Sequence, residues 1–64
     1  MNKNAEVWLN ERHGNTWTCN WTADVQGDAG WTIHHITITG KPRNLLILDY
    51  GPRDGFAVYQ HTTA

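Results

Sequence analysis

Apolar and polar residues alternate along much of this chain, and clusters of turn residues separate the alternating runs. In residues 16–25 the alternation is unbroken, which predicts a half-buried strand because successive side chains of a strand point to opposite faces. One face of this strand carries the apolar set Trp17, Cys19, Trp21, Ala23 and Val25. We expect that face, with Cys19 as a small and unreactive core residue, to pack into the interior.

Residues 31–39 are rich in β-branched side chains and predict a second strand. The alternation changes phase within it, because Trp31 and Ile33 fall on one face whereas Ile36 and Ile38 fall on the other. The change occurs at residues 34–35. It predicts either a β-bulge there or a strand that passes from one sheet face to another.

Residues 45–50 form a continuous apolar run, which predicts a strand buried on both faces. A turn with Pro52 and Gly55 follows, and residues 56–61 return as another strand. The first segment, residues 6–12, is ambiguous. We favour a strand, but a short helix would place Ala5, Trp8, Leu9 and Arg12 on one side.

These segments predict a single small β domain over residues 1–64. The expected fold is all-β: an antiparallel meander of about five strands, curled or closed into a small barrel. The alternative is an α+β fold with a short N-terminal helix.

The size of the chain limits how it can be stabilised. A chain of 64 residues buries only about 60% of the surface that its unfolded form exposes. Its single cysteine excludes an internal disulfide, so we expect dense packing of its four tryptophans, a homodimer, or a bound partner to supply stability.

The formal net charge of −1 lacks the basic excess of a strong phosphate-binding protein. No apolar run approaches the roughly 20 residues of a membrane span. The polar first residues lack the apolar core of a secretory signal. We therefore expect a cytoplasmic protein with no membrane partner.

The residues able to carry chemistry are scattered. Neighbouring His34 and His35 point to opposite faces of a strand, and the spacing of the histidines is unlike that of structural zinc ligands. We predict no metal and no cofactor, with metal-assisted assembly through His34 or His35 and His61 as a minor alternative. The acidic residues sit near turns, so we predict that the protein is not an enzyme.

The leading functional hypothesis is a non-enzymatic protein-binding module that covers a working surface of its partner. Trp, Tyr and Arg are the side chains that most often anchor protein interfaces. The candidate binding residues are Trp8, Trp31, Arg43, Arg53 and Tyr59. In size and in its lack of catalytic motifs the chain resembles the small inhibitors of phages and mobile elements, anti-CRISPR proteins among them. That resemblance is one of size class and implies steric inhibition.

The alternative hypothesis is a β-barrel that binds single-stranded nucleic acid. Small barrels bind single strands by stacking bases on exposed aromatic rings beside basic groups. The residues available for such a platform are Trp8, Trp31, Tyr50, Phe56 and Tyr59, with Arg43 and Arg53.

Overall fold

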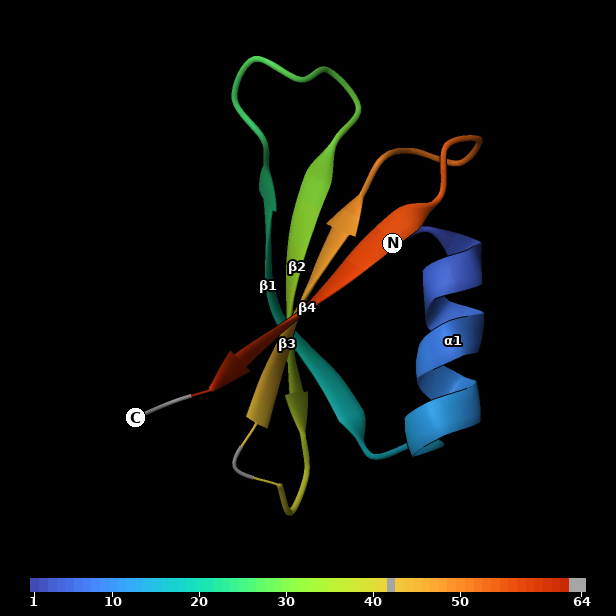
Figure 1. Cartoon of the computed structure of the whole chain (residues 1–64), viewed down its shortest axis with the longest axis vertical. Coiled ribbons are helices and arrows are strands. Elements are labelled where there is room, and N and C mark those ends of the chain that lie inside the picture. The colour runs from blue at the N-terminus through green and yellow to red at the C-terminus, as the bar shows by residue number, and fades with distance from the viewer. Residues whose placement is uncertain (42, 63–64) are drawn as a thin grey trace.

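The chain begins as a helix and then runs through four consecutive strands (Figure 1). The computed structural model describes residues 1–41 and 43–62, and of residues 61 and 62 it describes the backbone alone. The elements are α1 (Lys3–His13), β1 (Trp17–Asp24), β2 (Thr32–Ile38), β3 (Arg43–Asp49) and β4 (Phe56–Thr62). No helix among the described residues has the length and apolar character needed to cross a bilayer.

Helix α1 forms because both of its ends are capped and one side is apolar. At its start, the side-chain oxygen of Asn2 accepts a hydrogen bond from the backbone N–H of Asn4 at 2.8 Å. At its end, Gly14 adopts a positive φ of 59° and its N–H returns to the helix. Ala5 and Leu9 lie one turn apart and are buried. The segment that we favoured as a first strand is therefore the helix of the α+β alternative.

The strands form one antiparallel sheet in the order β1-β2-β3-β4. The predicted meander is confirmed. The sheet is open, because β1 and β4 are its two edges and do not pair with each other. Of the two forms expected for the meander, curled or closed, the closed barrel is not the one formed.

A β-bulge lies in β1, where the register shifts between Cys19 and Trp21. Before the bulge, Cys19 pairs with Ile36, a core residue on the side of α1. After the bulge, Trp21 pairs with His35 and so points to the opposite face. The single tryptophan-bearing face predicted for this strand is thus divided between the two sides of the sheet.

Strand β2 carries no bulge at its two histidines, because its pairing with β3 continues without a shift from Thr32 to Thr37. The change of phase in its sequence has another cause. Ile36 and Ile38 are buried beneath α1, whereas Ile33 is half-buried on the opposite face. The strand presents apolar side chains to both sides.

The core lies between α1 and the sheet. Its buried apolar members are Ala5, Leu9, Ile36, Ile38, Leu45 and Ile47, with Trp8, Trp17, Phe56 and Val58 packed against them. In β3 only alternate residues are buried, and Leu46 and Leu48 on the other face are half-buried. Cys19 is exposed, so the expectation of a core thiol was wrong.

Candidate functional site

The sheet face that points away from α1 carries an uncovered apolar surface, which we call the open face. One row across it joins Trp21, His35, Leu46 and Tyr59 on the four strands. A second row consists of Ala23, Ile33, Leu48 and Ala57. Within the described residues, the one helix lies on the other side of the sheet (Figure 1). As a result, Trp21 is 49% exposed and Tyr59 is 53% exposed.

The first strand contributes a rigid aromatic element to the open face. The rings of Trp21 and His35 stack in parallel, with centroids 5.3 Å apart. The amide nitrogen of Asn20, the bulged residue, lies 2.9 Å from Nδ1 of His35 and also donates to Oγ1 of Thr37. These contacts hold the ring pair in place. Beside it is a shallow hollow of about 280 Å³ lined by Trp21, Ile33, His35 and Leu46.

The open face extends toward one end of the sheet through two further aromatic residues. Trp31 and Tyr50 meet edge to face, with ring centroids 4.6 Å apart. Partial burial raises the pKa of Tyr50, and the neighbouring phenol of Tyr59 raises it further. Tyr50 thus links the Trp31 end of the sheet to Tyr59 in the first row.

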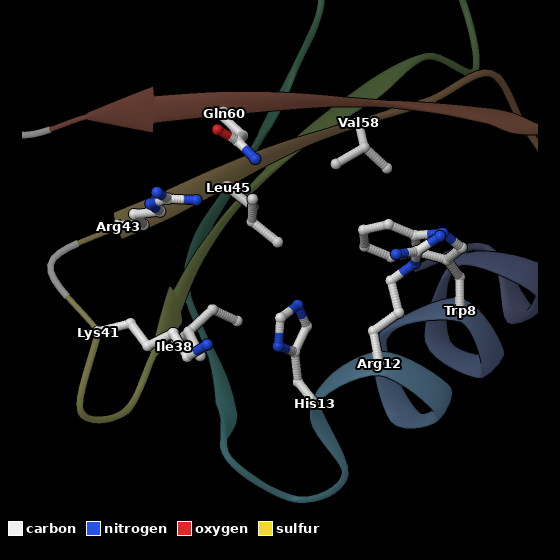
Figure 2. A pocket seen from close by; sticks show the side chains of 9 residues that line it. All are labelled: Trp8, Arg12, His13, Ile38, Lys41, Arg43, Leu45, Val58 and Gln60. Atoms are coloured by element: carbon white, nitrogen blue, oxygen red, sulfur yellow. The ribbon is translucent and has the colours of Figure 1, made fainter.

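A groove lies on the other side of the sheet, beside the C-terminal end of α1 (Figure 2). Its volume is about 670 Å³, and it is lined by Trp8, Arg12, His13, Ile38, Lys41, Arg43, Leu45, Val58 and Gln60. The guanidinium carbon of Arg12 lies 5.0 Å from the centre of the Trp8 ring, a cation–π contact. We call this site the basic groove.

The structure distributes the five predicted binding residues over three places. Trp8 and Arg43 line the basic groove. Tyr59 lies in the first row of the open face, and Trp31 lies at its end. Arg53 is exposed in the turn between β3 and β4. These residues do not form one surface.

Three central residues of the open face, Trp21, Ile33 and Leu46, were missed by sequence reasoning. Trp21 was assigned to the core because the bulge at Asn20 leaves no trace in the alternation of the sequence. The sequence did contain a signal for Leu46 and Ile33. The strand of Leu46 is apolar at consecutive positions, and the strand of Ile33 has apolar residues on both faces. A sheet with one helix has only one face to bury.

The aromatic residues expected to form a base-stacking platform are also divided. Trp8 belongs to α1 and so lies on the helix side of the sheet. There its ring makes a T-shaped contact with that of Phe56, with centroids 6.3 Å apart. Both residues pack against the core. Tyr59 is on the open face. The structure therefore does not assemble these aromatic residues into one stacking surface.

Beneath the N-terminus of α1 lies a buried polar cluster built on Asp49 and His34. Oδ2 of Asp49 lies 3.5 Å from Nε2 of His34 and accepts the backbone N–H of Asn2 at 2.5 Å. Oδ1 accepts the N–H of Gly51 at 2.8 Å. Burial raises the pKa of Asp49, but these hydrogen bonds and His34 outweigh it and hold the pKa below its ordinary value. Because the carboxylate is occupied by the chain itself, the cluster fastens the helix and does not present a reactive group.

The arrangement of metal-binding side chains gives no centre in the part of the chain that the structure describes. No group of three or more His, Cys, Asp or Glu side chains is placed to hold an ion there. His34 lies on the side of α1 and His35 on the open face. The side chain of His61, invoked for metal-assisted assembly, lies outside the described residues.

The open face and the basic groove are two surfaces of the described residues that a ligand or partner can reach. They lie on opposite sides of one sheet, and neither contains a nucleophile paired with a base. Comparison with models of known protein families, with curated proteins and with solved structures gives no match for this chain.

Proposed function

We propose that this protein is a non-enzymatic protein-binding module whose open face covers a functional surface of a partner protein. The observation that carries the proposal is the continuous set of apolar and aromatic side chains on a sheet face that no described element covers. The mechanism is steric: bound to its partner, the sheet occludes whatever the covered surface would otherwise contact.

The composition of the open face supports this proposal. An antiparallel sheet with one solvated face usually carries polar side chains there, because apolar side chains in water forgo the free energy of burial. Here both central rows contain large apolar or aromatic residues. Exposed patches of this kind mark interaction surfaces in soluble proteins.

The two most exposed aromatic residues are suited to anchor an interface. Trp21 and Tyr59 offer large, rigid surfaces with a polar atom at one end, and such residues supply much of the binding energy of protein interfaces. They occupy the two edge strands of the same row, with His35 and Leu46 between them. A partner seated on this row would therefore meet an anchor at each side and an apolar hollow beside Trp21.

The Trp21 anchor is held in a defined geometry before any partner arrives. The Trp21 ring is stacked on His35, and the amide of Asn20 fixes that histidine. A surface that is already ordered loses less conformational entropy on binding. This favours a partner recognised by shape over one that must reorganise the sheet.

The alternative of a single-stranded nucleic acid requires stacking rings and cations on one surface. The two central rows of the open face contain no Lys or Arg side chain beside their aromatic residues. We therefore propose a protein partner for the open face and not a single-stranded nucleic acid.

The test measures how much partner protein three tagged variants capture from a lysate of cells that make this protein. Trp21→Ala and Tyr59→Ala should each weaken capture, by about 2 kcal/mol of binding free energy where the residue is a true anchor. Val7→Ala is the matched control, since Val7 is 47% exposed on α1 and lies away from the open face. We expect the partner protein to stay bound at high salt and after nuclease treatment.

Capture that is unchanged in both aromatic variants, or equally weakened by Val7→Ala, would refute the proposal. Loss of all bound material on nuclease treatment would transfer the binding role to nucleic acid.

A further inference from the structure

The basic groove concentrates positive charge around one opening. Arg12 comes from the last turn of α1, Lys41 from the turn between β2 and β3, and Arg43 from the start of β3. In Figure 2 the side chains of these residues surround the groove, and the ring of His13 points into it from the end of the helix. Among the described lining residues, none is acidic.

The charged residues outside the groove are distributed differently. All four aspartates, Asp24, Asp28, Asp49 and Asp54, lie at the opposite ends of the strands or in the turns there. The other two cations, Lys3 and Arg53, are at that end as well. The net charge of −1 also counts Glu6 and Glu11 of α1, neither of which lines the groove, and it conceals an excess of cations at the groove and of carboxylates at the other end. Such an arrangement attracts a compact anion to one end, whereas a long polyanion would also meet the aspartates.

The interior of the groove is apolar. Ile38 and Leu45 belong to the buried core, and Val58 packs against it. Gln60 adds an amide at the rim. A ligand that satisfies both parts of the groove carries an anionic group for the cations and an apolar body for this floor.

The Trp8 ring is already in use within the protein. Arg12 lies over it, and the rings of His13 and Phe56 make T-shaped contacts with it, each with centroids 6.3 Å apart. The ring therefore helps to position Arg12, which occupies one of its faces. A guanidinium held in this way needs little further ordering to bind an oxyanion.

We propose that the basic groove is a binding site for a small organic phosphate of about mononucleotide size. A phosphate ester carries up to two negative charges and several acceptor oxygens, for which Lys41 and Arg43 lie on one side of the groove and Arg12 on the other (Figure 2); a single carboxylate has one charge and two oxygens. The apolar body of the ligand rests on Ile38, Leu45 and Val58. The groove volume of about 670 Å³ is within the range of small-ligand sites.

This site is separate from the proposed function, because the groove and the open face lie on opposite sides of the sheet. The probe is AMP, added to the isotope-labelled full chain and followed through the backbone amide signals. We expect shifts at Lys41, Arg43 and Gln60, weaker shifts with inorganic phosphate, and none with adenosine. Tyr59→Ala should leave AMP binding unchanged, which distinguishes failure of this site from failure of the open face.

The chain offers a matched pair of double variants. Lys41→Gln with Arg43→Gln removes two cations at the groove, and we expect AMP binding to weaken about tenfold or more. Lys3→Gln with Arg53→Gln removes the same charge at the other end and should change the affinity by less than about twofold.

Four results would overturn the proposal. The first is the absence of AMP binding, and the second is an equal loss of AMP affinity in the two double variants. The third is adenosine binding as tightly as AMP. The fourth is much tighter binding of a single-stranded oligonucleotide or of a glutamate-rich peptide through the same residues. The last would identify the groove as a macromolecular contact.

Discussion

Asn20 decides which tryptophan of β1 faces the solvent. As the bulged residue, it places Cys19 and Trp21 on opposite sides of the sheet. Its amide then reaches back to His35 and Thr37 on the neighbouring strand. A bulge of this kind re-aims side chains while the strand continues. The open face exists in its present form because of this one inserted position.

The reactivity of Cys19 tests the placement of β1. The thiol is exposed, and its contacts are a 3.5 Å approach to the carbonyl of Trp21 and a 3.7 Å approach to the hydroxyl of Thr22. We expect a thiol reagent to label native protein at a rate comparable to that in denaturant. Labelling slowed by orders of magnitude in the native state would show that the strand is packed the other way.

The carboxylate of Asp49 should make stability depend on acid pH. Its pKa is lowered in the folded protein, so the charged form stabilises the fold fully above the unfolded value of about 3.9. That contribution is lost as the pH falls through the lower folded pKa. Asp49→Asn should cost about 1–3 kcal/mol at neutral pH, because a buried N–H loses its acceptor.

Urea unfolding at neutral and acid pH measures this effect. The difference between the wild type and Asp49→Asn should narrow on acidification, whereas Asp54→Asn in the exposed turn should have little effect at either pH. A difference that stays constant with pH would contradict the role given to the charge.

At the scale of elements, α1 is fastened to the sheet at both ends. Near its C-terminal end, the indole N–H of Trp17 donates to the side-chain oxygen of Asn10 at 2.9 Å. At its N-terminus, the side-chain amide of Asn2 donates to the carbonyls of Gly51 at 2.8 Å and Gly55 at 3.3 Å. These contacts orient a helix that buries only Ala5 and Leu9 fully.

Asn2 should therefore matter more than its place near the chain end implies. Asn2→Ala removes the helix cap and the side-chain contacts to the β3–β4 turn, and we expect a loss of about 1–3 kcal/mol in the free energy of unfolding. Asn4→Ala, at an exposed position in the same turn of helix, is the control. Equal stability of the two variants, measured by chemical denaturation, would show that the cap and the turn contacts contribute nothing.

Four strands and their turns could be predicted from the sequence because alternating, apolar or β-branched runs are separated by glycine-containing turns. The predicted segments 16–25, 31–39, 45–50 and 56–61 correspond to β1, β2, β3 and β4. The first segment could not be decided by its pattern, since Trp8 and Leu9 fit a short strand as well as a helix. The cap formed by Asn2 depends on Gly51 and Gly55, which are distant in sequence. The bulge in β1 likewise follows from cross-strand contacts.

At the scale of the whole molecule, one helix covers one side of the sheet, and no described element covers the other side. The candidate residues Tyr59 and Trp31 could be selected from the sequence because Tyr and Trp often anchor protein interfaces. Their grouping with Trp21 and Leu46 required the register across four strands. The basic groove could not be predicted, because Arg12, Lys41 and Arg43 meet only when α1 packs beside β3.

If the open face serves binding and not folding, truncating it should leave the protein stable. We expect the double variant Trp21→Ala with Tyr59→Ala to lose less than about 1 kcal/mol of unfolding free energy. Leu9→Ala, which empties a fully buried site, should cost about 2–5 kcal/mol. Ile47→Val gives a milder core comparison at about 0.5–1.5 kcal/mol. A double variant as damaging as Leu9→Ala would make the open face part of the monomer's core.

Site-specific photocrosslinking in the cells that make this protein tests the central claim most directly. Tyr59 and Gln60 are neighbours on β4, both exposed, and point to opposite sides of the sheet. With a photoreactive phenylalanine at position 59, we predict a discrete adduct with a different protein, identified by mass spectrometry. With the same residue at position 60, we predict no such adduct. Adducts at position 60 and not at 59, or at neither, would contradict a protein partner on the open face.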